Sequence, residues 1–281
     1  MPLVTTAELV GTAYRAGAGL AAYNVITLEH AEAIAEAAER VGAPVILQIS
    51  ENAVGFHHGR VQPILVAASS VAAGAGVPVS VHLDHVEQVD LLHAAVAAGA
   101  TSVMFDASKL PYEANIAATR AAADWAHDRG VFVEAELGEV GGKDGAHAPG
   151  VRTDPGEAAR FVAATGVDAL AVAVGSSHAM TRREAQLDFD LIERLRAAVP
   201  VPLVLHGSSG VPQEGLRRAV RAGITKINVG TILNVAFTGE VRRYLAADDA
   251  VVDPRKYLGP ARAAMADTVA AITAAVTSAG R

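Results

Sequence analysis

Three histidines stand at or just beyond the ends of apolar, strand-like segments, and their residue type could hold a metal ion. They are His85, His178 and His206. Three imidazole ligands that leave a fourth position open are typical of a catalytic zinc site. Their separation along the chain is no metal-binding signature by itself. The prediction of a metal centre therefore depends on a fold that brings the three together.

An acidic residue lies beside the first of these histidines. Residues 81–86 (VHLDHV) continue a β-branched run that is typical of a buried strand. Charged groups are costly away from water unless a partner or a metal compensates, so we expect Asp84 and His85 at the strand's carboxyl end. Asp84 is then placed to move a proton beside the metal. His82 is expected to be a structural residue that orients another group.

Two segments of small and polar residues are candidates for binding phosphate. The first contains Gly207, Ser208 and Ser209, and the second contains Asn228, Val229, Gly230 and Thr231. Each lies between a predicted late strand and a helix, where backbone N–H groups can bind an anion. In a (β/α)8 barrel, the loops after strands seven and eight commonly bind phosphate. Together they predict a phosphorylated small molecule as substrate.

A metal, a phosphate site and an unpaired acid together predict one reaction type. A metal that binds the carbonyl and hydroxyl oxygens of a phosphorylated ketose stabilises an enediolate as a Lewis acid. Asp84 would move a proton at the carbon–carbon bond being made or broken, and that reaction is retro-aldol cleavage. Lys226 is the one candidate for a Schiff-base nucleophile inside the barrel, and we favour a structural or phosphate-facing role for it.

The elements that position these residues alternate along the whole chain. Strands are predicted over residues 20–25, 44–50, 77–85, 102–106, 131–137, 169–174, 201–206 and 226–229. Helical segments separate them, and helices over residues 231–245 and 258–278 end the chain. This pattern predicts an α/β fold, a single-domain (β/α)8 TIM barrel over residues 1–281 with a C-terminal helical extension over about 250–281. A doubly wound open sheet is the alternative, which the absence of a Gly-x-Gly-x-x-Gly motif disfavours.

A closed barrel would bring the polar ends of its strands to one mouth. The polar residues at or just beyond predicted strand ends are Asn24, Ser50, Asp84, His85, Asp106, Glu136, His178, His206 and Asn228. Single polar residues often occur at loop entrances by chance, but three histidines with several acids do so much less often. We therefore expect one active site at the carboxyl ends of the strands.

The composition excludes several classes of function. The chain has 281 residues, 51% of them hydrophobic, a formal net charge of −7 and no cysteine. Disulfides, thiolate zinc sites and a cysteine nucleophile are therefore excluded, and the absence of a basic run argues against a nucleic-acid partner. Residues 61–83 lack Asp, Glu, Lys and Arg, but prolines and glycines interrupt them, so no membrane span is expected. The N-terminus does not resemble a secretory signal, which predicts a cytoplasmic protein.

Six segments, in order along the chain, resemble those of the class II (metal-dependent) ketose-bisphosphate aldolases, the family of fructose- and tagatose-bisphosphate aldolases. They are residues 82–85 (HLDH), 102–108 (SVMFDAS), 134–138 (EAELG), 175–178 (GSSH), 206–210 (HGSSG) and 226–229 (KINV). The resemblance extends over nearly the whole chain, from residues 22–25 (AYNV) to 253–258 (DPRKYL). It implies a (β/α)8 barrel that assembles as a homodimer or homotetramer.

The resemblance also implies a metal centre. One catalytic Zn²⁺ per subunit would be bound by His85, His178 and His206. Asp84 would be the proton donor toward the aldehyde half of the substrate. Asp106 and Glu136 match positions where such enzymes can hold a second or displaced metal.

The substrate contacts implied by the resemblance lie around that centre. Dihydroxyacetone phosphate would lie on residues 207–209 and 228–231, with a monovalent cation (Na⁺ or K⁺) nearby. Asn24, Ser50 and Ala179 are further candidates for contact with the substrate. Arg255 matches an arginine that can reach the far phosphate, in some members across a subunit boundary.

The segments around the substrate depart from the family pattern. After Gly142 the family commonly has a Glu-Asp pair whose Glu moves the proton on the ketone half, and here Asp144 would have to serve. After His178 a glycine is usual, and here Ala179 follows. The acidic residue that is usual within three or four positions after Asn228-Val229 is missing. The sequence therefore leaves the sugar open: fructose or tagatose bisphosphate, or the deoxy-keto-gluconate phosphate of inositol breakdown.

Two other functions stay open at this point. A barrel isomerase or epimerase of phosphosugars would share the metal and phosphate sites, and exchange of a substrate proton without carbon–carbon cleavage would identify it. A non-catalytic partner subunit that keeps the fold is the other alternative. It ranks last, because all three candidate metal histidines are present.

Overall fold

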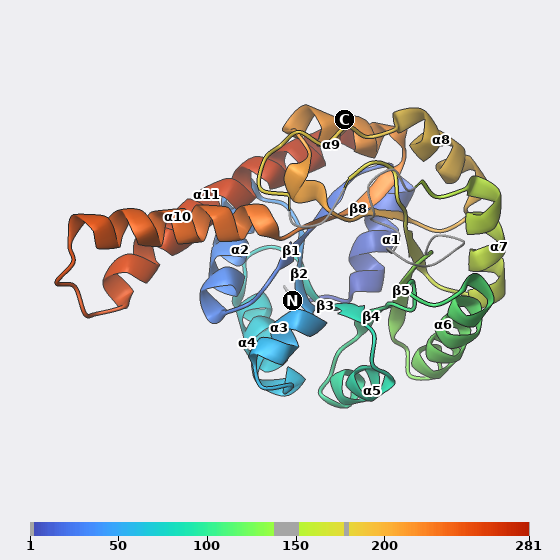
Figure 1. The fold of residues 1–281 in the computed structure, drawn as a ribbon, viewed down its shortest axis with the longest axis horizontal. Coiled ribbons are helices and arrows are strands. Elements are labelled where there is room, and N and C mark those ends of the chain that lie inside the picture. The colour runs from blue at the N-terminus through green and yellow to red at the C-terminus, as the bar shows by residue number, and fades with distance from the viewer. Residues whose placement is uncertain (1–2, 138–151, 177–179, 281) are drawn as a thin grey trace.

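Eight parallel strands close into a barrel (Figure 1). The computed structural model describes residues 3–137, 152–176 and 180–280. The strands pair in sequence order, and the last pairs with the first. They are β1 (Leu20–Asn24), β2 (Val45–Ser50), β3 (Val79–Val86), β4 (Ser102–Phe105), β5 (Phe132–Glu136), β6 (Ala169–Ala171), β7 (Leu203–Leu205) and β8 (Ile224–Val229). The predicted single-domain (β/α)8 barrel is confirmed, and the open-sheet alternative is wrong.

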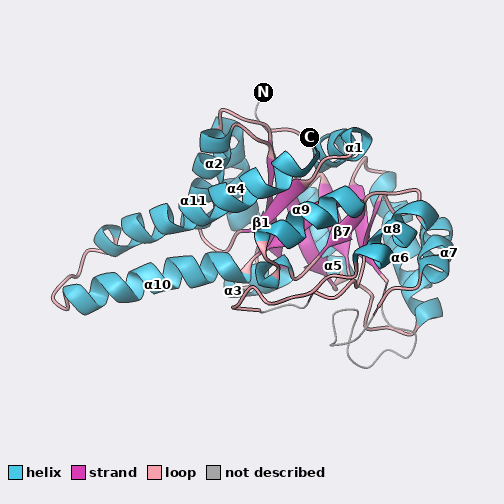
Figure 2. Ribbon diagram, turned by 90° about the horizontal axis from the view of Figure 1, so that it is seen from above, coloured by secondary structure: helices cyan, strands magenta, loops and turns pink. Residues whose placement is uncertain are grey.

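Helices surround the barrel (Figure 2). They are α1 (Thr6–Ala16), α2 (Leu28–Val41), α3 (Glu51–Phe56), α4 (Val61–Gly74), α5 (Val89–Ala97), α6 (Tyr112–His127), α7 (Pro155–Thr165), α8 (Phe189–Ala198), α9 (Gln213–Ala222), α10 (Thr231–Ala247) and α11 (Arg255–Thr277), with 3₁₀ turns at Ser208–Gly210 and Ser278–Gly280. Short acidic side chains begin two of them, because Asp154 and Asp188 each accept a backbone N–H of the first turn. Among the described residues, no helix has both the length and the apolar character that crossing a membrane requires.

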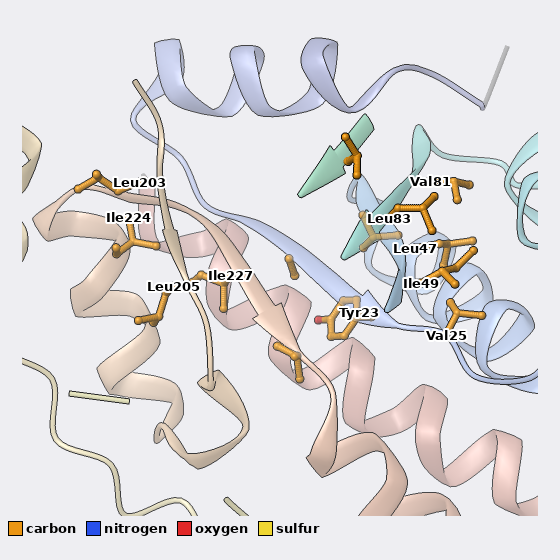
Figure 3. Close-up of a cluster of buried hydrophobic side chains, with 14 of the residues drawn as sticks. Tyr23, Val25, Leu47, Ile49, Val81, Leu83, Leu203, Leu205, Ile224 and Ile227 are labelled. Carbon is orange, nitrogen blue, oxygen red and sulfur yellow. The ribbon is translucent and has the colours of Figure 1, made fainter. Parts of the chain in front are cut away.

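The alternation of side chains along each strand separates two cores. Outward-facing side chains such as Leu47 and Ile227 pack with the helices in one continuous core (Figure 3). Inward-facing side chains such as Ile46 form a smaller cluster with Leu9 and Val10 of α1, which cover the amino-terminal end of the barrel. The interior of the barrel is apolar at that end, and the polar side chains that face inward lie toward its carboxyl end.

Several element bounds differ from the sequence prediction; for example, β3 and β7 each begin two residues later than predicted. β6 ends at Ala171, although residues 169–174 were predicted to be strand, because the chain then exchanges backbone bonds with Thr153 and Asp188. β8 begins two residues before the predicted segment 226–229. The short helix α3 was not predicted.

Helices α10 and α11 form a hairpin that extends away from the barrel (Figures 1 and 2). The inner part of α11 packs against α2 and β1. There the buried Tyr23 hydroxyl donates to the carbonyl of Val269 (3.2 Å) and shares a hydrogen bond with Thr273 Oγ1 (2.7 Å). The helical extension expected over about residues 250–281 is therefore the second arm of a hairpin that begins at Thr231.

Candidate active site

The end of β3 brings Asp84 and His85 to the mouth of the barrel together. Successive side chains of a regular strand point to opposite faces, but the pairing of β3 with β4 shifts between Leu83 and Val86. His85 has a φ of 51° at this irregularity. Bulges re-aim side chains, and the left-handed conformation costs a non-glycine residue about 1–2 kcal/mol. Strain that the surrounding structure imposes in this way is typical of functional sites.

His85 and His206 face one another across the mouth. Nε2 of His85 lies 3.1 Å from Nδ1 of His206. On its other side, His85 Nδ1 donates to Asp106 (2.7 Å), and His206 Nε2 donates to Glu134 (3.1 Å). A carboxylate accepts hydrogen bonds and has none to donate. Each of these two carboxylates therefore takes the ring hydrogen on its own side. The two facing nitrogens, with Glu136 Oε2 3.7 Å from Nδ1 of His206, surround a place for a cation or a proton.

The arrangement fits a metal ion. Two nitrogens bound to one tetrahedral Zn²⁺ at ~2.0 Å stand about 3.3 Å apart, close to the 3.1 Å between the two rings. Ligand atoms of Asp84, His85 and His206 all lie within 4.8 Å of one another. The same holds for His85, Asp106 and Glu136, so the residues predicted for a second metal are near enough to share an ion with His85.

The carboxylates set the charge of the mouth. Burial lowers the pKa of His85, but the charge of Asp84 and the hydrogen bond to Asp106 outweigh burial and raise that pKa to about 10. A metal ion binds the neutral imidazole, so metal binding at His85 would displace this proton. Burial raises the pKa of Asp106, but the hydrogen bond and charge of His85 hold it below its ordinary value.

Asp84 lies between two side-chain amides. Gln48 Nε2 donates to its Oδ2 and Asn228 Nδ2 to its Oδ1, both at 3.3 Å. Burial raises the pKa of Asp84, against the positive charges of His85 and Lys226, which lower it. A carboxyl group whose pKa is raised beside a candidate metal centre is suited to proton transfer.

The two predicted phosphate-binding segments meet beside the mouth. Gly207 has a φ of 67°, which glycine adopts without steric cost, and the turn that follows carries Ser209 to the start of α10. Ser209 Oγ accepts the N–H groups of Gly230 (3.3 Å) and Ile232 (3.2 Å). Asn24 lies against Gly230. The result is a surface of hydroxyl, amide and backbone N–H groups at a helix N-terminus, which suits a phosphate.

Several other predicted substrate residues have structural partners. Ser50 Oγ caps α3 by accepting the N–H of Ala53 (3.2 Å). Ser208 Oγ donates to a backbone carbonyl three residues earlier (3.1 Å). Val229 packs in the outer core, so only its backbone can face the mouth. Thr231 is the first residue of α10.

Arg255 lies away from the mouth, and three other predicted residues lie outside the described part of the chain. Arg255 begins α11 at the outer end of the hairpin (Figure 2), where it is exposed and paired with Asp253 (2.8 Å). It therefore does not reach the mouth of its own barrel. His178, Ala179 and Asp144 lie outside the described residues.

Comparisons with known proteins agree with this geometry. The family model of class II fructose-bisphosphate aldolases matches residues 4–281. The chain belongs to the class II fructose-bisphosphate aldolase family. It is 42% identical over 272 residues to the fructose-bisphosphate aldolase of Staphylococcus aureus (strain Mu50), covering 96% of this chain and 95% of that protein. It is 43% identical over 272 residues to the fructose-bisphosphate aldolase of Geobacillus stearothermophilus, with the same coverage of both.

A solved structure supports the same assignment. The YdjI aldolase from Escherichia coli K12 matches with a TM-score of 0.82 and 33% identity, over 98% of this chain and 97% of that one. As a class II aldolase, the chain is a carbon–carbon lyase that acts on a ketose bisphosphate, and its family is metal-dependent. These findings favour the predicted aldolase over the isomerase and the non-catalytic subunit.

Sequence analysis gave no role to two residues that shape the site of this aldolase, Gln48 and Glu134. Gln48 contacts Asp84. The sequence feature that could have identified it is a single amide side chain within the apolar segment 44–50. Glu134 and Lys226 form a buried ion pair inside the barrel (2.8 Å), which gives Lys226 a structural role and turns it away from any phosphate. The sequence feature that could have identified them is a charged residue at a position of a strand that faces into the barrel.

His82 has the structural role expected for it. Its Nδ1 shares a hydrogen bond with Ser102 Oγ (2.6 Å) inside the barrel. Burial, and then the charge of Lys226, hold the pKa of His82 well below its ordinary value. The ring is therefore neutral and supports the layer of side chains below the mouth.

Proposed function

We propose that this chain is a zinc-dependent fructose-1,6-bisphosphate aldolase, which cleaves its substrate reversibly to dihydroxyacetone phosphate and glyceraldehyde 3-phosphate. The observation that carries the proposal is the facing pair of nitrogens on His85 and His206, with the carboxyl group of Asp84 within 4.8 Å. The printed names of the curated relatives support fructose bisphosphate as the sugar.

The metal would be held by histidines from three strand ends. His85 and His206 would bind it through the two facing nitrogens, and His178, outside the described residues, would be the third ligand. Imidazole ligands with an open position suit zinc. When bound, Zn²⁺ supplies Lewis-acid polarisation of the substrate carbonyl.

Asp84 would handle the proton of the aldehyde half. In cleavage its carboxylate takes the proton of the C4 hydroxyl as the C3–C4 bond breaks, and the electron pair of that bond remains with C3, next to the polarised C2 carbonyl. In the synthetic direction the same carboxyl group returns the proton to the aldehyde oxygen. Gln48 and Asn228 orient the two carboxylate oxygens for this transfer. Asp144 would deliver the proton to C3 of the ketone half.

The phosphate of the ketone half would bind where Ser209 meets the start of α10. The Ser209 hydroxyl accepts the N–H groups of Gly230 and Ile232 and keeps its own hydrogen, which would bind the phosphate together with the N–H of Thr231. Na⁺ or K⁺ would balance the charge nearby. Asn24 would contact the substrate beside Gly230.

Binding of the far phosphate of the substrate, the one on its aldehyde half, would require a second subunit. Arg255 lies at the outer end of the hairpin, away from its own mouth (Figure 2). In a homodimer or homotetramer it would bind the far phosphate in the site of a partner subunit. We propose that this assembly acts in the cytoplasm.

Zinc content and aldol cleavage, measured on the same preparations, test the proposal. Asp84→Asn is expected to keep zinc and to lose about 10²- to 10⁴-fold in kcat, the usual contribution of a positioned acid or base. His206→Asn is expected to lose zinc. The matched control is His127→Asn, because His127 lies on α6 and pairs with Asp168 outside the mouth. Full turnover in Asp84→Asn, or full zinc content in His206→Asn, would contradict the proposed roles.

A further inference from the structure

A charged pair is sealed inside the barrel below the mouth. Lys226 on β8 and Glu134 on β5 both have fully buried side chains, and Nζ of the lysine lies 2.8 Å from Oε2 of the glutamate. The attraction between two buried charges often does not offset the free energy of their desolvation. Apolar side chains of similar volume commonly stabilise a core at least as much as such a pair does. Stability alone therefore does not explain why the barrel contains this pair.

By distance alone, Glu134 is also a candidate metal ligand. Its carboxylate forms a group with His82 and Asp84 whose ligand atoms lie within 4.8 Å of one another. The Lys226 ammonium already supplies a positive charge to this carboxylate at 2.8 Å. One oxygen of Glu134 thus has a cationic partner within the protein, and the other points at the imidazole ring of His206.

That second oxygen contacts the ring of His206. Oε1 of Glu134 lies 3.1 Å from Nε2, and both side chains are fully buried. A carboxylate has no hydrogen to donate, so the bond requires a hydrogen on Nε2. A neutral imidazole carries one ring hydrogen, which leaves Nδ1 as the acceptor on the side facing His85.

Another neighbour favours the opposite tautomer. Asn228 Nδ2 lies 3.0 Å from the same Nε2, and an amide nitrogen can only donate there. The amide is held this way round because Nδ2 also donates to Asp84 (3.3 Å). Without Glu134, His206 Nε2 would accept from Asn228, the ring hydrogen would move to Nδ1, and that hydrogen would point toward His85.

We propose that Glu134, paired with Lys226, is a positioning residue that fixes His206 in the tautomer with hydrogen on Nε2 and so keeps Nδ1 available to the metal. The inference rests on the proposed function in one respect, that His206 binds the metal. Carboxylates that hold metal-binding histidines in this way commonly change metal affinity by about 10- to 100-fold when they are removed.

The tautomer can be read directly in the metal-free protein. Long-range ¹H–¹⁵N spectra of ¹⁵N-histidine protein distinguish the two ring nitrogens, and the His206→Asn variant identifies the His206 signals. The expected result is a protonated Nε2 and an unprotonated Nδ1. A ring with its hydrogen on Nδ1 in the unaltered protein would overturn the inference, and this measurement does not depend on whether any variant of Glu134 folds.

Two charge-neutral double variants then separate positioning from simple support of the fold. Glu134→Gln/Lys226→Met removes both charges but keeps a carbonyl acceptor for Nε2, whereas Glu134→Leu/Lys226→Met also removes the acceptor. Zinc dissociation constants, measured by competition with a chelator, are expected to rise about 10- to 100-fold for the Leu variant and only a few-fold for the Gln variant. The Leu variant should also show the Nδ1–H tautomer.

The outcomes distinguish the inference from the proposed function. Equal zinc affinity in the two double variants and the unaltered protein would overturn the positioning role of Glu134 and leave the zinc aldolase intact. Absence of zinc binding by the unaltered protein would overturn the proposed function, and the inference with it.

Discussion

Gly230 is the position at which one methyl group should disturb the substrate side of the mouth. A Cβ there would lie 2.8 Å from Nδ2 and 3.0 Å from Cγ of Asn24, whereas relaxed carbon contacts are about 3.5–4.0 Å. The φ of −133° at this position lies outside the left-handed region that favours glycine. Crowding is therefore the expected effect of Gly230→Ala, and Asn24 has to move by roughly 0.5–1 Å.

The displaced side chain disturbs its neighbours. Asn24 Oδ1 accepts a hydrogen bond from Gln48 Nε2 (2.5 Å), and the same nitrogen donates to Asp84. Loss of the bond between Asn24 and Gln48 is expected to lower the free energy of unfolding by about 0.5–1.5 kcal/mol. A shift of ~1 Å beside the proton-transferring carboxylate is expected to lower kcat/KM by about 10- to 100-fold.

Steady-state cleavage of fructose 1,6-bisphosphate and urea unfolding measure the two effects. Gly239→Ala is the matched control, because a Cβ at that exposed position of α10 meets nothing within 4 Å. Alanine in place of a helical glycine is expected to stabilise by about 0.5–1 kcal/mol, with activity unchanged. Normal kcat/KM in Gly230→Ala, or equal losses in both variants, would refute the crowding of Asn24.

Three further results are expected. Tyr23→Phe should lower the free energy of unfolding by about 1–3 kcal/mol, because Thr273 loses its buried partner; restoration by Thr273→Val in the same background checks the cause, and no loss in urea unfolding would contradict it. Ser209→Ala should raise KM about 10-fold with kcat little changed, because the hydroxyl lies at the phosphate segment; a fall in kcat alone would point to another role. Burial lowers the pKa of His30, so below about pH 6.5 the unfolded chain binds a proton more readily than the folded one. The free energy of unfolding should therefore fall by up to about 1.4 kcal/mol per pH unit from this group. His30→Gln should flatten the dependence of that free energy on pH between pH 7 and 5, and an unchanged dependence would argue against the role of His30.

The barrel and its polar mouth could be predicted because they depend on local patterns. Asp84, His206 and Asn228 each end an apolar segment, and the carboxyl ends of parallel strands in a barrel meet at one mouth whatever the details of their pairing. The same reasoning brings together the two segments that carry Ser209 and Gly230, which the structure joins by hydrogen bonds. Knowledge of strand register was not needed for these predictions.

Features that depend on long-range geometry could not be predicted. Glu134 and Lys226 lie on strands that are not neighbours, and the inward residues that meet across a barrel are set by its tilt and stagger. The left-handed backbone of His85 has no signal in the residue type. β6 reads as six residues of strand, but its last apolar residues bond to a loop that precedes α7 and to the start of α8.

The most direct test is the release of dihydroxyacetone phosphate from fructose 1,6-bisphosphate, measured before chelation, after chelation and after Zn²⁺ is added back. Zinc content is measured at each stage. The account predicts release that stops with chelation and returns with zinc. Release that continues in protein shown to be free of metal would contradict it, and so would a zinc-loaded enzyme that releases none.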